Sequence, residues 1–292
     1  MQTISLKSSG TEFTAYQIGQ GEPVLLLHGF PDNPKSFFPL MEILSAKGYQ
    51  CVAPILRGYE PQTITHPSRL HINELVEDAL GWFDSLKWNK AHWIGHDWGG
   101  AIGYSLASYS PNRIKTLTAL SIPLLKKLTT GLLWTPQQVI YSWYIVLFQV
   151  PFLAELAIKA NDFSLINFLW RDWSPNFNPG ESHLHEIKSM FANPGILASA
   201  LSYYRNLGDL WSESGRETMF GILDQRLNVP TQTIYGKEDG CVHKKLYEKM
   251  SVAEDSPQGF RKIEMEGIGH FPHFENPKEV SEFCIDWMKR IP

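Results

Sequence analysis

Short apolar runs alternate with helical patterns along the first part of the chain, and this alternation constrains the fold more than any other feature of the sequence. Each run is bounded by Gly, Pro or charged residues, as β-strands are; the runs lie at residues 13–18, 24–27, 50–53, 91–94 and 114–120. Apolar residues between 72 and 86 follow the period of an amphipathic helix. This alternation predicts an α/β fold with a mostly parallel sheet flanked by helices.

The same alternation returns near the C-terminus, after a long interruption. We predict strands at residues 231–235 and 260–265, and helices at residues 244–250 and 277–288. The intervening segment has helical patterning and Pro or Gly breaks, without strand alternation. A chain of 292 residues has room for one sheet and such an insertion. We therefore predict a core domain of residues 1–122 and 221–292, with an inserted helical cap, or lid, of residues 123–220.

The predicted insertion is rich in aromatic residues and poor in charged ones. Sixteen of the chain's Trp, Tyr and Phe residues fall within it. Most of them would form its own core, and an apolar lid would also suit an active site beneath it. The most apolar stretch, residues 139–158, is interrupted by Gln149, Pro151 and Glu155, so it lacks the roughly 18 uncharged apolar residues of a membrane-spanning helix. We expect this stretch to be buried or to line a cavity.

Charge and cysteine content exclude several classes of protein. The formal net charge is -4 and no run of Lys or Arg is longer than two, so we expect no nucleic-acid partner. Three cysteines lie far apart, which argues against a disulfide framework. The N-terminal residues lack the apolar segment of a secretory signal. We therefore expect a reduced, cytoplasmic protein.

Residues 91–100 carry the sharpest local motif. An apolar strand runs into Gly95-His96-Asp97-Trp98-Gly99, and small residues then open a helix. This is the context of a nucleophile elbow, in which glycines relieve the crowding of a strained turn. Asp97 stands where such motifs usually carry Ser. Taken alone, the motif also fits an ordinary tight turn in which Asp97 caps the helix.

A second motif ends the strand predicted at residues 24–27, where the sequence reads His28-Gly29-Phe30-Pro31. In hydrolases that have an elbow, a loop at this place supplies one backbone N–H, and the residue after the nucleophile supplies another. The N–H groups of Phe30 and Trp98 would then form an oxyanion hole. Without the elbow, His28-Gly29 would be no more than a turn with a loop histidine.

Two further polar residues follow predicted strands. Asp239 comes after residues 231–235, and His270 lies in a glycine-rich loop after residues 260–265. Singly, each is an ordinary polar loop residue. Together with Asp97, they give the order nucleophile, acid, histidine that hydrolases with an elbow use.

With these loops in this order, the chain resembles the α/β-hydrolases of the epoxide hydrolase and haloalkane dehalogenase branch over nearly all of its length. Its elbow is similar to the one typical of epoxide hydrolases. In that family two cap tyrosines hold the epoxide oxygen. The resemblance places the first at Tyr144, within residues 143–149, and the second at Tyr204, within residues 201–206.

Helical spacing bears on this choice of tyrosines. Tyr204 shares a helix face with Leu201, whereas Tyr203 is rotated by about 100°. The spacing therefore favours Tyr204. Tyr141 and Tyr144 share a face, so only the resemblance selects Tyr144, and Tyr141 remains a reserve candidate.

The resemblance implies a mechanism that needs no cofactor. Asp97, with an ordinary pKa near 3.9 and a helix N-terminus behind it, would be ionised and attack a ring carbon to form an alkyl ester. Tyr144 and Tyr204 would protonate the epoxide oxygen as the ring opens. His270, oriented by Asp239, would then activate the water that hydrolyses the ester. The predicted substrates are a small hydrophobic epoxide and water, and the product is a vicinal diol.

Histidines 183, 185, 270 and 273 raise the question of a metal. Neither the 183/185 pair nor the 270/273 pair has a Cys or acidic cluster that completes a four-ligand set. We therefore predict no metal site.

Two alternatives to epoxide hydrolysis remain. A haloalkane dehalogenase would use Asp97 and the same ester, with Trp98 as a halide donor, but members of that branch commonly have Asn where this chain has Phe30. A non-catalytic protein of the same fold could close its lid on a small apolar ligand. It would not need the water-activating pair Asp239 and His270, so we favour the epoxide hydrolase.

Overall fold

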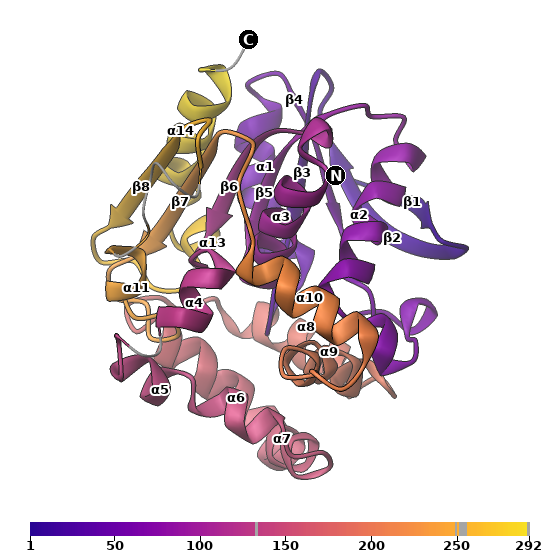
Figure 1. Ribbon diagram of the computed structural model, residues 1–292, viewed down its shortest axis with the longest axis vertical. Helices are drawn as coiled ribbons and strands as arrows, with labels where there is room; N and C mark the ends of the chain where they lie inside the picture. The colour runs from indigo at the N-terminus through magenta and orange to yellow at the C-terminus, as the bar shows by residue number, and fades with distance from the viewer. Residues whose placement is uncertain (132–133, 249, 251–255, 291–292) are drawn as a thin grey trace.

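The computed structural model describes residues 1–131, 134–248, 250 and 256–290 (Figure 1). In these residues, one sheet has eight strands in the order β1-β2-β4-β3-β5-β6-β7-β8. The pairs β1–β2 and β2–β4 are antiparallel and the other neighbours are parallel, which confirms the predicted mostly parallel sheet. The strands are β1 (Gln2–Ser8), β2 (Thr11–Ile18), β3 (Glu22–Leu27), β4 (Tyr49–Pro54), β5 (Ala91–His96), β6 (Ile114–Leu120), β7 (Thr231–Gly236) and β8 (Phe260–Met265).

Strand β1 is absent from the sequence-based prediction. It pairs only with β2 and contacts α2. Of its residues only Ile4 and Leu6 are apolar, and Ile4 is only partly buried. An edge strand with so few apolar residues gives a weak alternation signal, which is why the pattern did not reveal it.

Helices cover both faces of the sheet. Successive residues of β3 point to opposite faces, so Val24 and Leu26 join one apolar cluster while Leu25 and Leu27 join the other. The first cluster lies under α1 and α14, and the second lies under α2 and α3. These helices are α1 (Phe38–Ser45), α2 (Ile72–Ser85), α3 (Trp98–Tyr109) and α14 (Pro277–Lys289).

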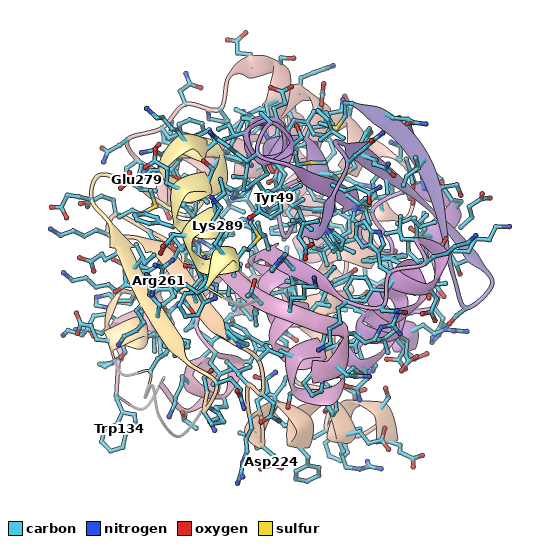
Figure 2. The ribbon with its side chains drawn as sticks, turned by 90° about the horizontal axis from the view of Figure 1, so that it is seen from above. Tyr49, Trp134, Asp224, Arg261, Glu279 and Lys289 are labelled. Carbon is cyan, nitrogen blue, oxygen red and sulfur yellow. The ribbon has the colours of Figure 1, made fainter. Side chains whose placement is uncertain are left out.

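The C-terminal helix packs on one face of the sheet and also contacts the edge strand β8. Figure 2 shows α14 beside β8, with Glu279 and Lys289 on the helix and Arg261 on the strand. The Arg261 guanidinium donates to the Phe283 carbonyl oxygen (2.8 Å) and lies over the Trp287 ring. These contacts fix the half of the sheet that carries the last two predicted site loops.

Between β6 and β7 the described chain forms helices without strands, as predicted. Figure 1 shows most of this insertion gathered at one end of the molecule, beyond the sheet. The helices are α4 (Leu125–Gly131), α5 (Gln137–Tyr141), α6 (Trp143–Phe148), α7 (Leu153–Trp173), α8 (Glu181–Ala192), α9 (Ile196–Asn206) and α10 (Glu213–Leu223). Helix α7 is interrupted by non-helical backbone at residues 160–163, and α10 continues across residue 220, where the domain boundary was predicted.

Short helices complete the described elements. Two α-helices of one turn, α11 (Lys245–Glu248) and α13 (Pro272–Glu275), follow β7 and β8. Four 3-10 helices each begin with proline, and they span Pro34–Phe37, Pro61–Thr63, Pro67–Arg69 and Pro111–Arg113. The helix predicted at residues 244–250 corresponds to α11, and its residue 249 lies outside the described residues.

The prediction that residues 139–158 are buried or line a cavity is wrong for one side of this stretch. Tyr144 and Phe148 face inward, but Ile140 is 73% exposed and Phe152 is 88% exposed. The stretch has apolar residues on both sides of its helices, so its composition could not indicate which side faces solvent. Among the described residues, no helix is long and apolar enough to cross a bilayer.

Candidate active site

Asp97 lies in the sharp turn between β5 and α3. Its backbone has a φ of 50° and a ψ of -115°, which is strained for a residue other than glycine. A β-carbon at Gly95 would lie 2.2 Å from the Gly99 carbonyl oxygen, and one at Gly99 would lie 2.0 Å from the Leu27 carbonyl oxygen. The two glycines therefore make the turn possible. The Asp97 side chain makes no capping hydrogen bond to α3, unlike the simple cap considered from the sequence.

Two backbone N–H groups act on the Asp97 carboxylate. The N–H of Phe30 donates to Oδ1 at 2.8 Å, and the N–H of Trp98 lowers the pKa of the carboxyl group. Gly29 permits this close approach, because a β-carbon there would lie 2.3 Å from Oδ1. The two N–H groups predicted to form an oxyanion hole therefore converge on one side chain.

His28 and Pro31 shape the loop that carries Phe30. The N–H of Leu56 donates to His28 Nε2 (3.1 Å), so the ring proton resides on Nδ1, which donates to the Gly29 carbonyl oxygen (3.0 Å). Burial lowers the pKa of His28 to about 4, which keeps the ring neutral. The Phe30–Pro31 peptide bond is cis. His28 therefore supports the loop and does not face the Asp97 carboxylate.

The carboxyl group of Asp97 is harder to ionise than the sequence suggested. Burial raises its pKa to about 6, against the lowering effects of His270 and of the Phe30 and Trp98 N–H groups. The expectation of an ordinary pKa near 3.9 is therefore wrong, because it left out desolvation. At pH 7 the group is still mostly ionised.

His270 and Asp239 form a buried pair. Nδ1 of His270 lies 3.0 Å and 3.2 Å from the two oxygens of Asp239. Because an ionised carboxylate can only accept, Nδ1 carries a proton, and Nε2 is the nitrogen that can gain or lose one. Nε2 is buried and has no hydrogen-bond partner among the described residues. Burial lowers the pKa of His270, but the charge and hydrogen bond of Asp239 and the neighbouring Cys241 together outweigh burial and raise that pKa well above the ordinary value.

Glu275 holds the loop that carries His270. Its carboxylate accepts from the backbone N–H groups of Gly269 (2.8 Å) and Phe271 (2.9 Å), on either side of the histidine, and from the Ser174 hydroxyl (2.7 Å). Sequence reasoning assigned no role to Glu275. Its position five residues after His270, in the same loop, was the available signal.

The end of α7 joins the His270 loop to the Asp239 loop. The Trp173 carbonyl oxygen accepts from the N–H of His270 (3.0 Å) and from the N–H of Gly240 (3.2 Å). His96 adds a further hydrogen bond to the His270 loop, because its Nε2 donates to the His270 carbonyl oxygen (2.9 Å). Burial lowers the pKa of His96 well below its ordinary value, so it serves as a neutral donor.

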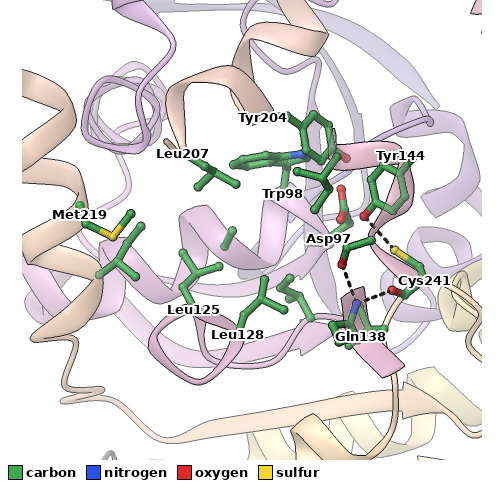
Figure 3. A pocket seen from close by; sticks show the side chains of 16 residues that line it. Asp97, Trp98, Leu125, Leu128, Gln138, Tyr144, Tyr204, Leu207, Met219 and Cys241 are labelled. Atoms are coloured by element: carbon green, nitrogen blue, oxygen red, sulfur yellow. Dashed lines mark hydrogen bonds between the residues drawn. The ribbon is translucent and has the colours of Figure 1, made fainter. Parts of the chain in front are cut away.

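A pocket opens beside Asp97 (Figure 3). Its two ends differ in character. The end at Asp97 carries polar groups, which belong to Asp97, Gln138, Tyr144, Tyr204 and Cys241. The other end is apolar and is lined by Leu125, Leu128, Leu207 and Met219. A ligand that fits this pocket would place a polar group at Asp97 and an apolar body toward α4 and α10.

Tyr144 and Tyr204 both line this pocket, on helices α6 and α9. Their ring centroids are 5.9 Å apart, edge to face. The Tyr204 hydroxyl has no hydrogen-bond partner among the described residues, and the Tyr144 oxygen lies 3.3 Å from the sulfur of Cys241. Burial raises the pKa of both phenols well above 10, so both carry their protons at neutral pH.

The neighbouring tyrosines lie elsewhere. The Tyr203 hydroxyl donates to the Arg57 carbonyl oxygen (2.7 Å), in the core. Tyr141 packs against His243 and does not line the pocket at Asp97. Of the four tyrosines considered from the sequence, the structure therefore brings only Tyr144 and Tyr204 to Asp97.

Comparisons with known proteins agree with this arrangement of strands and loops. Residues 22–277 match the family model of the alpha/beta hydrolase fold. The chain belongs to the α/β-hydrolase fold family. This α/β-hydrolase is 29% identical to the AB hydrolase superfamily protein YfhM of Bacillus subtilis, over 92% of this chain and 91% of that protein. It is 27% identical to epoxide hydrolase 4 of Homo sapiens, over 98% of this chain and 78% of the relative.

Solved structures extend this similarity to the whole chain. A variant of an epoxide hydrolase from Bacillus megaterium, crystallised with its diol product, superposes with a TM-score of 0.85 at 26% identity. The superposition covers 98% of this α/β-hydrolase and 100% of the other chain.

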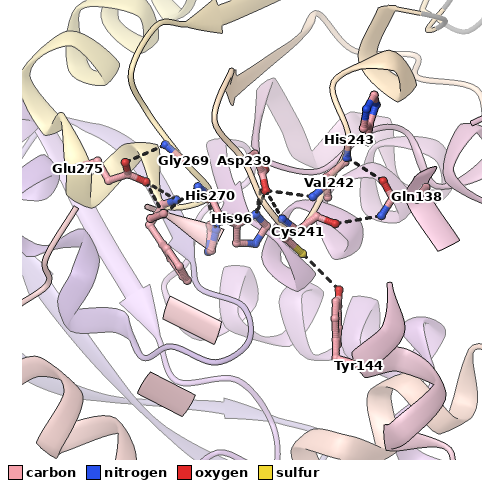
Figure 4. A network of polar contacts seen from close by, with 12 residues as sticks. His96, Gln138, Tyr144, Asp239, Cys241, Val242, His243, Gly269, His270 and Glu275 are labelled. Atoms are coloured by element: carbon pink, nitrogen blue, oxygen red, sulfur yellow. Dashed lines mark hydrogen bonds and ion pairs between the residues drawn. The ribbon is translucent and has the colours of Figure 1, made fainter. Parts of the chain in front are cut away.

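Two residues of this α/β-hydrolase site belong to none of the motifs used for prediction. Gln138 Nε2 donates to the Cys241 carbonyl oxygen (2.9 Å), and its Oε1 accepts from the His243 N–H (2.7 Å) (Figure 4). The N–H of Cys241 donates to Asp239 Oδ1 (2.7 Å). Cys241 could have been noticed two residues after the predicted acid. Gln138 could not, because it reaches the site from α5.

The fold also gathers possible metal ligands that their spacing in the sequence did not reveal. Two groups of side chains each place one ligand atom per residue within 4.8 Å of the others, namely Asp32 with His96 and His273, and Asp239 with Cys241 and His270. An acid or a Cys therefore does lie near His270 and His273, although each group has three residues and is not the four-ligand set considered from the sequence. In the first group, Asp32 already accepts from the Ser36 hydroxyl (2.6 Å) and lies 3.1 Å from His183 Nε2. The second group is the buried histidine pair with the neighbouring thiol.

Proposed function

We propose that this α/β-hydrolase is an epoxide hydrolase that converts a hydrophobic epoxide and water to a vicinal diol. One observation carries the proposal: two buried, protonated phenols lie in the same pocket as a carboxylate that accepts a hydrogen bond from a backbone N–H. Ring opening at a saturated carbon needs a nucleophile on carbon and an acid on oxygen. The names of the relatives, which include epoxide hydrolases, support the same reaction.

In the first step, one oxygen of Asp97 attacks a ring carbon and the C–O bond of the ring breaks. Oδ1 stays with the N–H of Phe30, so the other oxygen is the one that forms the ester bond. The ring oxygen leaves as an alkoxide unless it receives a proton. Tyr144 and Tyr204 donate hydrogen bonds to it, and one of them supplies the proton.

In the second step, His270 Nε2 takes a proton from water and the hydroxide attacks the ester carbonyl carbon of Asp97. The oxyanion that develops on Oδ1 is stabilised by the N–H groups of Phe30 and Trp98. Collapse of this intermediate breaks the bond to the alkyl oxygen, which takes the proton of the new Asp97 carboxyl group as the diol leaves. Asp239 orients the ring and stabilises its positive charge.

The change in the charge of Asp97 between the two steps supports this order of events. Before the reaction, the ionised Asp97 carboxylate and the Asp239 carboxylate both favour a protonated His270. Ester formation removes the charge of Asp97. The pKa of His270 then falls, and its extra proton replaces the one that the tyrosine gave up, so the histidine becomes a base only when there is an ester to hydrolyse.

The helical insertion supplies the acid groups and the apolar end of the pocket. We keep the division into a core of residues 1–122 and 221–292 and a cap of residues 123–220 as part of this proposal. The apolar lining at Leu125, Leu207 and Met219 favours a substrate with a hydrocarbon or aromatic body. In this proposal the cap determines which epoxides bind and the core carries out both covalent steps.

Haloalkane dehalogenation is the second candidate, because the buried Trp98 indole N–H has no hydrogen-bond partner among the described residues and Trp98 lines the pocket. Such a donor could hold a leaving halide. The test is to incubate the protein with styrene oxide and, separately, with 1-bromobutane, and to measure diol and bromide. We expect diol from styrene oxide and no bromide. Release of bromide without diol formation would refute the epoxide hydrolase.

A further inference from the structure

The thiol of Cys241 is part of the pocket wall next to Tyr144. Cys241 is buried, and its sulfur lies 3.3 Å from the Tyr144 oxygen, within the range of a hydrogen bond to sulfur. Figure 3 shows the sulfur and the phenol oxygen facing each other beside Asp97. The other two cysteines, Cys51 and Cys284, belong to the apolar cluster on the opposite face of the sheet.

A second observation separates the two pocket tyrosines. The Tyr204 hydroxyl is buried without a partner, whereas the thiol is the one hydrogen-bond partner found for the Tyr144 hydroxyl among the described residues. The unpartnered His270 Nε2 also belongs to this end of the pocket, and the possible ligand atoms of Cys241, Asp239 and His270 lie within 4.8 Å of one another. The thiol therefore lies between one of the two phenols and the buried histidine pair.

The direction of the hydrogen bond decides what Tyr144 can do. If the phenol donates to sulfur, its proton is turned away from a substrate. If the thiol donates to the phenol oxygen, the phenol proton is free to point into the pocket. Burial raises the pKa of Cys241, so the thiol keeps the proton that it needs as a donor.

We propose that Cys241 is a positioning residue for Tyr144: its thiol donates a hydrogen bond to the phenol oxygen and directs the phenol proton toward the epoxide oxygen above Asp97. This inference rests on the proposed function, because it gives Tyr144 the role of an acid. Cys241 itself touches neither the attacking carboxylate oxygen nor the water in this scheme. Its effect is confined to ring opening.

The backbone of Cys241 is held so that the thiol stays at Tyr144. Its carbonyl oxygen accepts from Gln138 Nε2 (2.9 Å), and its N–H donates to Asp239 Oδ1 (2.7 Å). Figure 4 shows this chain of contacts from Gln138 through Cys241 to Tyr144. Since Gln138 and Tyr144 lie on adjacent helices α5 and α6 of the insertion, the insertion holds both the thiol and its partner.

The test is a single-turnover experiment on the full chain with styrene oxide, in which rapid quenching and intact-mass measurement follow ester formation and ester hydrolysis separately. The variants are Cys241→Ala, Cys241→Ser and Tyr144→Phe, with the double variant of Cys241→Ala and Tyr144→Phe. Cys284→Ala is the matched control, because it removes a buried thiol away from the pocket. Thermal unfolding of each variant reports on folding.

We expect Cys241→Ala to slow ester formation by about 3- to 10-fold, the range of one lost hydrogen bond, and to leave ester hydrolysis unchanged. Cys241→Ser should recover most of the rate, since its hydroxyl is also a donor. In the Tyr144→Phe background, Cys241→Ala should have no further effect. A purely structural role would slow both steps and would not depend on Tyr144.

The outcomes separate this inference from the proposed function. Normal ester formation in Cys241→Ala, or the same slowing with and without the Tyr144 hydroxyl, would overturn the positioning role while the epoxide hydrolase stands. If the unsubstituted protein makes diol without any ester, the proposed mechanism fails first and the inference falls with it.

Discussion

The carboxylate of Asp97 is buried in a place that disfavours its charge. Its pKa of about 6, against an ordinary 3.8, corresponds to roughly 3 kcal/mol of unfavourable free energy for the ionised form. Two N–H donors and a histidine offset only part of the desolvation. A desolvated carboxylate is also a better nucleophile toward carbon than a hydrated one, so the property that costs stability serves the proposed reaction.

Replacement of Asp97 by Asn should therefore stabilise the protein while it abolishes diol formation. The pKa of Asp97 is higher in the folded state than in the unfolded state. Ionisation of Asp97 therefore lowers the free energy of unfolding as the pH rises from about 3.8 to about 6, and this loss is absent below about 3.8. We expect Asp97→Asn to raise the free energy of unfolding by about 1–3 kcal/mol near neutral pH, and the gain to vanish near pH 4. Urea unfolding at both pH values measures this.

Asp239→Asn is the matched control for that experiment. It removes a carboxylate that is paired with His270, so it should lower the free energy of unfolding where Asp97→Asn raises it. A loss of stability near neutral pH in Asp97→Asn would contradict the account of its charge.

At the scale of helices, strands and loops, loops and helix ends bring the site residues together. The end of α7 bonds the Asp239 and His270 loops, and Glu275 binds the backbone on both sides of His270. The sequence predicted the loops themselves, because each follows a predicted strand; the ranges predicted for β6 and β8 are the observed ones. It could not predict the bonds between loops, since Ser174 and Gln138 come from elements far away in the chain.

Substitution of Glu275 by Gln should loosen the His270 loop. An amide group offers one acceptor oxygen in place of two, so at least one of the backbone N–H groups at Gly269 and Phe271 loses its partner. We expect a loss of about 1–3 kcal/mol in the free energy of unfolding by urea. In single turnovers, ester hydrolysis should slow more than ester formation, because only the former uses His270.

Glu282→Gln is the control, because Glu282 is an exposed residue of the following helix. It should change neither the stability nor the two rates. Equal slowing of both steps by Glu275→Gln would show that the loop does more than hold the base.

At the scale of the whole molecule, the insertion and the sheet each supply half of the site. Tyr204 packs edge to face on Trp98 (5.1 Å) and on Phe30 (5.5 Å), so an insertion helix contacts both loops that bind Asp97. The sequence predicted the insertion from its helical pattern. It did not predict which side faces solvent, because residues 128–154 contain no charged side chain at all.

Loss of both pocket hydroxyls should stop ring opening without unfolding the protein. In the double variant Tyr144→Phe and Tyr204→Phe we expect no ester with styrene oxide. The melting temperature should be nearly unchanged, since the Tyr204 hydroxyl has no partner to lose and the Tyr144 hydroxyl has only a thiol.

Tyr203→Phe is the neighbouring control for this pair. It breaks the bond to the Arg57 carbonyl oxygen, so it should lower the free energy of unfolding by about 1 kcal/mol while diol formation continues. Full ring-opening activity in the double variant would remove the acid role from both pocket tyrosines.

The central claim is that Asp97 carries the covalent ester, and isotope transfer tests it most directly. A single turnover with excess enzyme in H₂¹⁸O is followed by mass analysis of the diol and of the peptide that contains Asp97. Because water attacks the carbonyl carbon of the ester, the account predicts ¹⁸O in the Asp97 carboxylate and an unlabelled diol. A diol that carries ¹⁸O after the first turnover, with an unlabelled Asp97, would contradict it.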